Sequence, residues 1–240
     1  MKRFLILALG ITLTLQAQRA LTAQEVGEAS VNFLIGKVSY KTNDSNATWK
    51  PLKKGDKIGE GDTISTGNGS TATINYKNSE IKISPNTTIQ VKSLYAKGKD
   101  GSVEVKNGMA WFKLEKLEGQ KFQTVTPTAT AGVRGTAFAT LYDEKTKSSM
   151  NCICDGKVEV ASTEKGAKSK IIEKGSGSSF QSGDTKIDLT SYKNDIVKKE
   201  SNPSFQKKID DSPLLKNCLS CHTPKGWKAE GVIKDDKYSK

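Results

Sequence analysis

The sequence is poor in the residues that commonly act in catalysis. It contains a single histidine, His222, among 240 residues. No serine between residues 30 and 181 can therefore be paired with a histidine base from the same segment. The glycine-rich loop followed by Lys-Ser or Lys-Thr, which cradles phosphates in nucleotide-binding proteins, is also missing. We therefore expect a protein that is not an enzyme and has no catalytic residues.

Aromatic residues are also scarce, at 7%, although the chain is strongly basic with a net charge of +12. The lysines are spread along the chain and interleaved with acids. No aromatic cluster offers a platform on which bases could stack, so nucleic acid is not expected as a partner. The charge is compatible with weak association with an anionic membrane or cell-wall surface.

Long hydrophobic runs are absent except at the N-terminus. Lys2 and Arg3 precede an apolar run from Phe4 to Leu15, which is short for a membrane span and typical of a secretory leader. An ordinary buried helix is the other interpretation. We expect residues 1–23 to be a cleaved signal peptide and the mature protein to be periplasmic or extracellular. No later segment is apolar enough to serve as a transmembrane segment after leader removal.

Short apolar stretches separated by turn residues follow, from residue 30 to residue 181. Apolar residues alternate with polar ones, and Asn107-Gly108 and Asp155-Gly156 predict hairpin turns. This pattern predicts an all-β fold, an antiparallel β-sandwich or β-roll of many short strands, over residues 28–188. The expected strands are Val31–Tyr40, Thr71–Tyr76, Glu80–Ile83, Thr88–Lys92, Ser102–Val105, Met109–Leu114, Lys121–Val125, Ala137–Tyr142, Ser149–Cys154, Lys157–Ala161 and Lys170–Ile172.

The segment Thr124–Thr140 is extended in character. Its threonines alternate with Pro127 and two alanines at the two-residue period of a strand, and Pro127 predicts an edge, a strand start or a bulge. Gly132 and Gly135 bracket Arg134 and allow positive φ or close approach of another backbone. Arg134 is either exposed on a turn or folded back onto carbonyl or carboxylate groups.

This segment and its flanks resemble the FecR family. Thr126–Thr136 resembles that family's TPTA…VRGT segment, and similar flanking patterns occur at Trp49–Asp56, Gly61–Gly67 and Asp155–Val160. The resemblance covers roughly residues 30–185 and implies a β domain. Regulators of that family typically carry a cytoplasmic anti-sigma segment and a membrane span ahead of this domain, whereas here the expected leader occupies that place. Fold does not fix function.

Residues 189–240 are expected to form a short, weakly helical C-terminal tail that is not an independent domain. The tail contains Cys218-Leu219-Ser220-Cys221-His222, and Cys-x-x-Cys-His is the attachment sequence of c-type haem. Cys218 and Cys221 would form thioethers with the porphyrin, and His222 would be the proximal ligand of the iron. Because fewer than twenty residues follow the motif, the haem would need walls from the β domain.

The second axial position has several candidates. A second histidine does not exist, so the sulfur of Met109 or Met150, or a deprotonated Lys225 or Lys228, could bind the iron, or the position could stay open. We favour Met150 among the side chains, because a strand would place it on one face with Cys152 and Cys154. An open position would favour sensing of a small ligand over electron transfer.

The cysteines also permit other interpretations. Cys218 and Cys221 could form a plain disulfide in an oxidising compartment. Zinc could be bound by Cys152, Cys154, Cys218 and Cys221. Cys152 and Cys154 could also simply be buried core residues, since cysteine is commonly buried.

Two functions follow from these observations. The first is an exported FecR-like protein with a covalent haem c, acting in redox, electron transfer or sensing with an unknown redox or envelope protein partner. The alternative is a non-enzymatic periplasmic binding, structural or signalling module whose cysteines form disulfides or a zinc site, without haem.

Overall fold

A computed structural model of the chain describes residues 29–117, 119–185 and 187–191. The expected signal peptide and the tail motif with Cys218, Cys221 and His222 lie outside these residues. So do the candidate ligands Lys225 and Lys228.

The described residues contain strands, turns and bends but no helix, which confirms the all-β prediction. Accordingly, no helix in this part of the chain could cross a membrane. The strands are β1 (Ala29–Ile35), β2 (Val38–Lys41), β3 (Lys50–Pro51), β4 (Lys57–Ile58), β5 (Thr63–Thr66), β6 (Thr71–Tyr76), β7 (Ser79–Ile83), β8 (Thr88–Ser93), β9 (Gly101–Lys113), β10 (Phe122–Val125), β11 (Ala129–Val133), β12 (Ala137–Asp143), β13 (Ser148–Asp155), β14 (Lys157–Ser162), β15 (Lys170–Glu173), β16 (Ser176–Gln181) and β17 (Asp188–Ser191).

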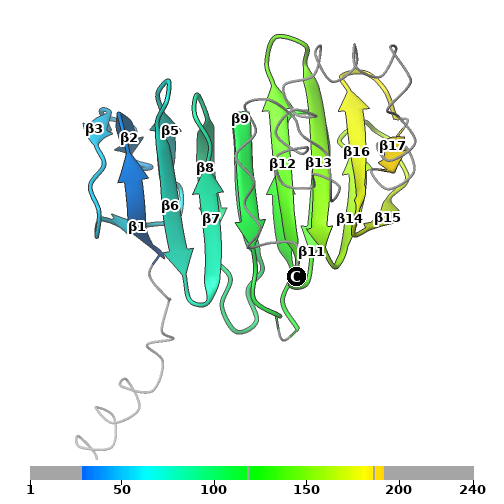
Figure 1. Cartoon of the computed structure of the whole chain (residues 1–240), viewed down its shortest axis with the longest axis horizontal. Coiled ribbons are helices and arrows are strands. Elements are labelled where there is room, and N and C mark those ends of the chain that lie inside the picture. The colour runs from blue at the N-terminus through cyan, green and yellow to red at the C-terminus, as the bar shows by residue number, and fades with distance from the viewer. Residues whose placement is uncertain (1–28, 118, 186, 192–240) are drawn as a thin grey trace, which may run out of the picture.

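The strands form two sheets that share one long strand. The first sheet has the order β4-β1-β6-β7-β9-β12-β13-β16-β17 and is antiparallel throughout. The second sheet has the order β3-β2-β5-β8-β9-β10-β11-β14-β15. The chain moves along the sandwich in sequence order, so its colour changes steadily from one end to the other (Figure 1).

Strand β9 passes from one sheet to the other. Its first half pairs with β8 in the second sheet up to Asn107, and its second half pairs with β12 in the first sheet from Gly108. Gly108 has a φ of +85° at this crossing. The predicted hairpin at Asn107-Gly108 is therefore wrong. The positive φ that this dipeptide favours serves here to redirect a single strand between two layers.

One strand pair is parallel. β10 runs alongside β9 with Phe122 opposite Gly101, whereas the sequence predicted antiparallel pairing throughout. Because β9 bends between the sheets, its two ends lie close together, and the Phe112 and Phe122 rings are 5.7 Å apart. A short connection can therefore return the chain to the start of β9 and continue in the same direction.

The core fills the space between the two sheets. The predicted alternation is confirmed, since Ala72, Ile74, Tyr76, Ile81, Ile83, Ile89 and Val91 are all buried. Their polar neighbours in β6, β7 and β8 are partly or fully exposed. Burying each isoleucine stabilises the fold by about 1.5–3 kcal/mol relative to leaving it exposed.

Gly135 lies where no side chain fits. It has a φ of +102°, and a Cβ atom there would lie 2.7 Å from Lys116 Cα and 2.9 Å from the Glu115 carbonyl oxygen. We expect Gly135→Ala to lower the free energy of unfolding by about 1–3 kcal/mol, because it adds backbone strain and a clash with backbone atoms. Denaturant titration followed by circular dichroism measures this change.

Gly132 provides the matched control, because a Cβ there would meet only the Glu159 carbonyl oxygen at 3.9 Å. Gly132→Ala should stay within about 1 kcal/mol of the wild type. Equal effects of the two substitutions would show that the turn at Gly135 tolerates a side chain.

Candidate functional site

Sulfur-containing and apolar side chains form two rows across the first sheet. In the first row, Trp111 of β9 is opposite Ala139 of β12, which is opposite Cys152 of β13. In the second row, residues Met109, Leu141 and Met150 of the same three strands are opposite one another. We call these six residues the sulfur face. The sequence predicted that Met150, Cys152 and Cys154 share one face. This holds for Met150 and Cys152, whereas the register of β12 and β13 skips Cys154.

The sulfur face lies on the side of the sheet away from the core. Its strand neighbours Ala110, Phe112, Phe138 and Ile153 belong to the core cluster, and none of the six residues does. Because successive side chains of a strand point to opposite sides, the six residues point away from the second sheet.

These residues are nevertheless well buried. Trp111 is 7% exposed, Leu141 9% and Cys152 1%. Met109 and Met150 are half-buried. The Lys82 amine lies 5.0 Å from the centre of the Trp111 ring, a cation–π distance. The outer face therefore combines thioether, thiol and indole groups in a site of low water content.

Cys154 lies at an irregularity of β13. The pairing of β12 and β13 shifts between Ala137 and Phe138, so Cys154 is the additional residue of a β-bulge. It is buried but is not part of the core cluster. Soft donors such as thiolates and thioethers suit haem iron, Cu(I) or Zn²⁺. The described residues do not bring three His, Cys, Asp or Glu side chains together, and two of the four predicted zinc ligands lie outside them.

The Thr124–Thr140 segment contains the end of β10, all of β11 and the start of β12, and its first part is a hairpin between β10 and β11. The backbone N–H of Thr126 donates to the Ala129 carbonyl (2.8 Å), and the Ala129 N–H donates to Thr126 Oγ1 (2.9 Å). Pro127 is exposed in the turn between β10 and β11, so its prediction as an edge, strand start or bulge is wrong. Proline there fixes the φ that the turn requires.

Arg134 is exposed in the turn between β11 and β12. Its guanidinium makes no hydrogen bond or ion pair with another residue of the described ranges. This position fits the interpretation of a solvated surface arginine.

A buried cluster of hydroxyl groups joins the two sheets and was not predicted. Thr140 Oγ1 lies 2.8 Å from Thr124 Oγ1 and donates to Asn151 Oδ1 over 2.8 Å. The Ser149 hydroxyl bonds to Thr126 Oγ1 (2.6 Å) and to Thr128 Oγ1. The run of threonines in the sequence was the available signal. These groups are neutral and satisfy one another, so they align the sheets and offer no acid or base.

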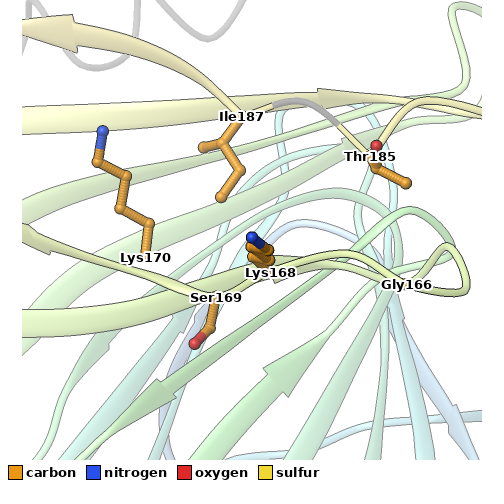
Figure 2. A pocket seen from close by; sticks show the side chains of 6 residues that line it. All are labelled: Gly166, Lys168, Ser169, Lys170, Thr185 and Ile187. Atoms are coloured by element: carbon orange, nitrogen blue, oxygen red, sulfur yellow. The ribbon is translucent and has the colours of Figure 1, made fainter.

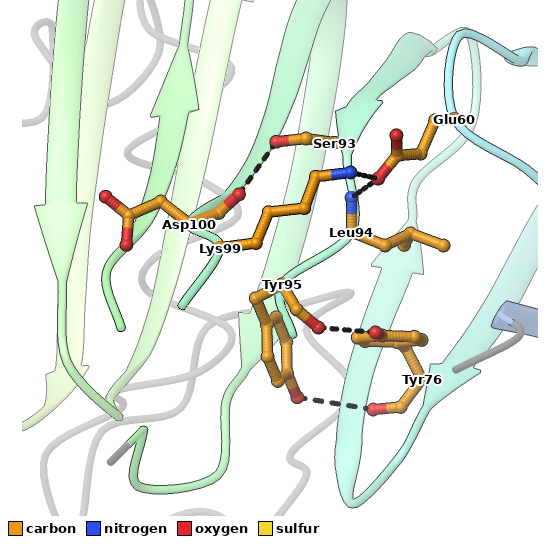
Figure 3. Close-up of polar contacts among 7 residues, drawn as sticks. All are labelled: Glu60, Tyr76, Ser93, Leu94, Tyr95, Lys99 and Asp100. Atoms are coloured by element: carbon orange, nitrogen blue, oxygen red, sulfur yellow. Dashed lines mark hydrogen bonds and ion pairs between the residues drawn. The ribbon is translucent and has the colours of Figure 1, made fainter. Parts of the chain in front are cut away.

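A second polar cluster fixes the loop between β8 and β9 (Figure 3). Glu60 accepts hydrogen bonds from the Lys99 amine (2.6 Å) and the Leu94 N–H (2.8 Å), and these bonds lower the pKa of its carboxyl group. Nearby, the Tyr76 hydroxyl donates to the Tyr95 carbonyl. Burial raises the pKa of Tyr95 well above its usual value, so its phenol is neutral at physiological pH. These contacts are structural.

A hollow of about 370 Å³ lies beside the start of β15 (Figure 2). Its lining residues are Gly166, Lys168, Ser169, Lys170, Thr185 and Ile187. Lys168 and Lys170 are exposed, and the lining contains no acid. The hollow is thus weakly cationic, but it holds no buried polar group that would define a ligand.

Comparison with known proteins gives one family match and a distant structural likeness. No curated protein matches the sequence. Two crystal structures of a proposed anti-sigma factor from Parabacteroides distasonis ATCC 8503, at 1.65 and 2.50 Å resolution, are each 18% identical with a TM-score of 0.47. Each alignment covers 54% of this chain and 59% of the other. These values carry no functional argument.

The family match is more informative. Residues 62–159 match the family model described as FecR protein. This range extends from β5 into β14 and includes the sheet crossing at Gly108, the threonine hairpin and the sulfur face. The matched part of the chain is therefore a β domain similar to that of the FecR family.

Proposed function

We propose that this chain is a non-enzymatic FecR-like protein of the cell envelope that carries a c-type haem in its tail and acts in electron transfer or sensing. The observation that carries this proposal is the pentapeptide Cys218-Leu219-Ser220-Cys221-His222, which contains the only histidine of the chain. A chance match to this motif is rare in a chain with one histidine and four cysteines.

The residues of the motif have separate roles. The thiols of Cys218 and Cys221 would each add across a vinyl group, forming a carbon–sulfur bond while the thiol hydrogen goes to the neighbouring carbon. His222 would hold the proximal axial position through an imidazole nitrogen. A haem bound there supplies reversible one-electron chemistry or, with an open position, small-ligand binding.

The β domain supplies a fitting environment on its sulfur face. Met150 is half-buried there and offers a thioether, the ligand type that raises the potential of histidine-ligated iron. Trp111 and Leu141 supply apolar surface, which excludes water and keeps the dielectric constant low. These features support Met150 as the second axial ligand, with Met109 as the other methionine of the same row.

The location and partners belong to the same proposal. Lys2 and Arg3 before the apolar run support export, and haem attachment to this motif takes place in an exported compartment. The family match supports a signalling context, with an unidentified redox or envelope protein as partner.

The test is expression of the full chain in a host with haem-attachment machinery. We expect haem that stays on the protein through a denaturing gel, because two thioether bonds survive denaturation. Cys218→Ser combined with Cys221→Ser should remove it completely. Cys152→Ser, which removes a thiol outside the motif, is the matched control and should retain it.

Spectra then test the ligands. Met150→Ala should abolish the long-wavelength methionine–iron band and allow carbon monoxide to bind the ferrous protein rapidly. A Met150→Ala protein with an unchanged spectrum would refute this ligand. Absence of a Soret band in the wild-type protein would refute the haem. It would favour the alternative function, a non-enzymatic module whose cysteines form disulfides or a zinc site.

A further inference from the structure

We propose that residues 213–222 of this same chain dock on the sulfur face, over β9, β12 and β13. The first reason is burial. Trp111 and Leu141 point away from the core, yet at most 9% of either residue is exposed in the single chain. An outward-facing tryptophan on a two-layer sandwich would otherwise be largely exposed, so a covering segment is needed.

The described strands do not provide this cover. All of them belong to the two sheets, and the second sheet packs against the opposite, core-bearing face. The exposures are those of one chain, so a second copy or another protein is not needed to explain them. The occupant that we infer is therefore a segment of the same chain outside the described ranges.

The residues that follow Ser191 are numerous enough to reach the sulfur face. The last described strand, β17, is separated from β13 only by β16, which places the two about 10 Å apart. The residues between Ser191 and Pro213 could span about 70 Å when extended, so they connect easily.

The N-terminal side fits less well. After removal of the expected leader only residues 24–28 precede β1, and they reach about 17 Å. β1 lies three strand steps, about 14 Å, from β9 but five steps, about 24 Å, from β13, so these residues could reach Trp111 but not Cys152.

Residues 213–222 also match the face in chemistry. Leu214, Leu215 and Leu219 supply apolar side chains next to Cys218 and Cys221, and cysteine is itself commonly buried. Docking would bring the thiols of the tail beside Cys152 and Met150. The β domain would then form one wall of whatever the tail motif binds, and the inference does not depend on haem being that group.

The test uses the full chain made without haem-attachment machinery and kept reduced. Under native conditions Cys152 should react slowly with N-ethylmaleimide, as peptide mass spectrometry would show. Leu214→Asp combined with Leu215→Asp should accelerate labelling of Cys152 by about tenfold or more, because the cover would be displaced. Val232→Asp combined with Ile233→Asp, further along the tail, is the matched control and should not.

Equal labelling rates in the two double variants, or rapid labelling in the wild type, would overturn the proposal. The melting temperature would show whether the β domain stays folded in each variant. Because no haem is present, these outcomes are separate from failure of the proposed haem.

A proximity measurement provides independent support. In a Cys154→Ser, Cys221→Ser protein, oxidation by dissolved oxygen should join Cys152 to Cys218 as a disulfide, because two neighbouring thiols can pair without access for a bulky external reagent. The control protein also carries Cys152→Ser and Trp49→Cys, so its second thiol lies beside the edge strand β3, at a residue that is 48% exposed. It should give little crosslink to Cys218. Equal yields from the two proteins would contradict docking.

Discussion

Phe112→Ala is expected to lower the free energy of unfolding by about 3–5 kcal/mol, the usual cost of removing a fully buried phenylalanine. Phe112 lies in the half of β9 that belongs to the first sheet and is completely buried. Its ring stacks on Phe138 at 5.1 Å and meets Phe122 at 5.7 Å, so the substitution removes contacts to both sheets. Denaturant titration of the purified protein measures the loss.

Phe33→Ala is the matched control for the same change of side chain. Phe33 is 48% exposed on β1, so its removal should cost less than about 1 kcal/mol. A small effect at Phe112, comparable to that at Phe33, would mean that the aromatic cluster does not join the two sheets. Typical stabilities of 5–15 kcal/mol make the expected loss at Phe112 large enough to threaten folding.

Gly108→Ala is expected to cost about 3 kcal/mol or more, because two penalties add at the sheet crossing. The residue has a φ of +85°, and a Cβ there would lie 2.4 Å from Thr87 Oγ1 and 2.7 Å from the Asn86 carbonyl oxygen. Thr87 cannot easily move away, since its hydroxyl accepts from the Met109 N–H over 3.0 Å. Thermal or denaturant unfolding measures the change.

Gly69→Ala separates the two penalties. Gly69 has a φ of +62°, and nothing lies within 4 Å of a Cβ built there. This substitution should therefore show the backbone strain alone, about 1–2 kcal/mol. If Gly108→Ala cost no more than Gly69→Ala, the close approach of Thr87 would not constrain the crossing.

Local pattern was enough to predict much of the sandwich. Alternation predicted β6 over Thr71–Tyr76 with the bounds that the structure shows, and it gave the buried residues of β7 and β8. The two-residue period of a strand is a local property, because the side-chain direction at each position depends only on the backbone next to it. The same rule placed Met150 and Cys152 on one face.

The short edge strands could not be predicted in this way. β3 and β4 have two residues each and show no period that sequence could reveal. They exist because neighbouring strands offer free backbone groups, so their pairing depends on chain segments far away in the sequence.

The sequence by itself determined the fold class, the alternation of the core strands and the residue types of the tail motif, since these depend on local backbone preference and on composition. Only the tertiary structure decided that Asn107-Gly108 is a sheet crossing, because an Asn-Gly pair supplies positive φ for either a reversal or a bend. It also decided that Trp111 and Leu141 are buried on the outer face. Burial depends on what packs over a side chain, and no local pattern contains that information.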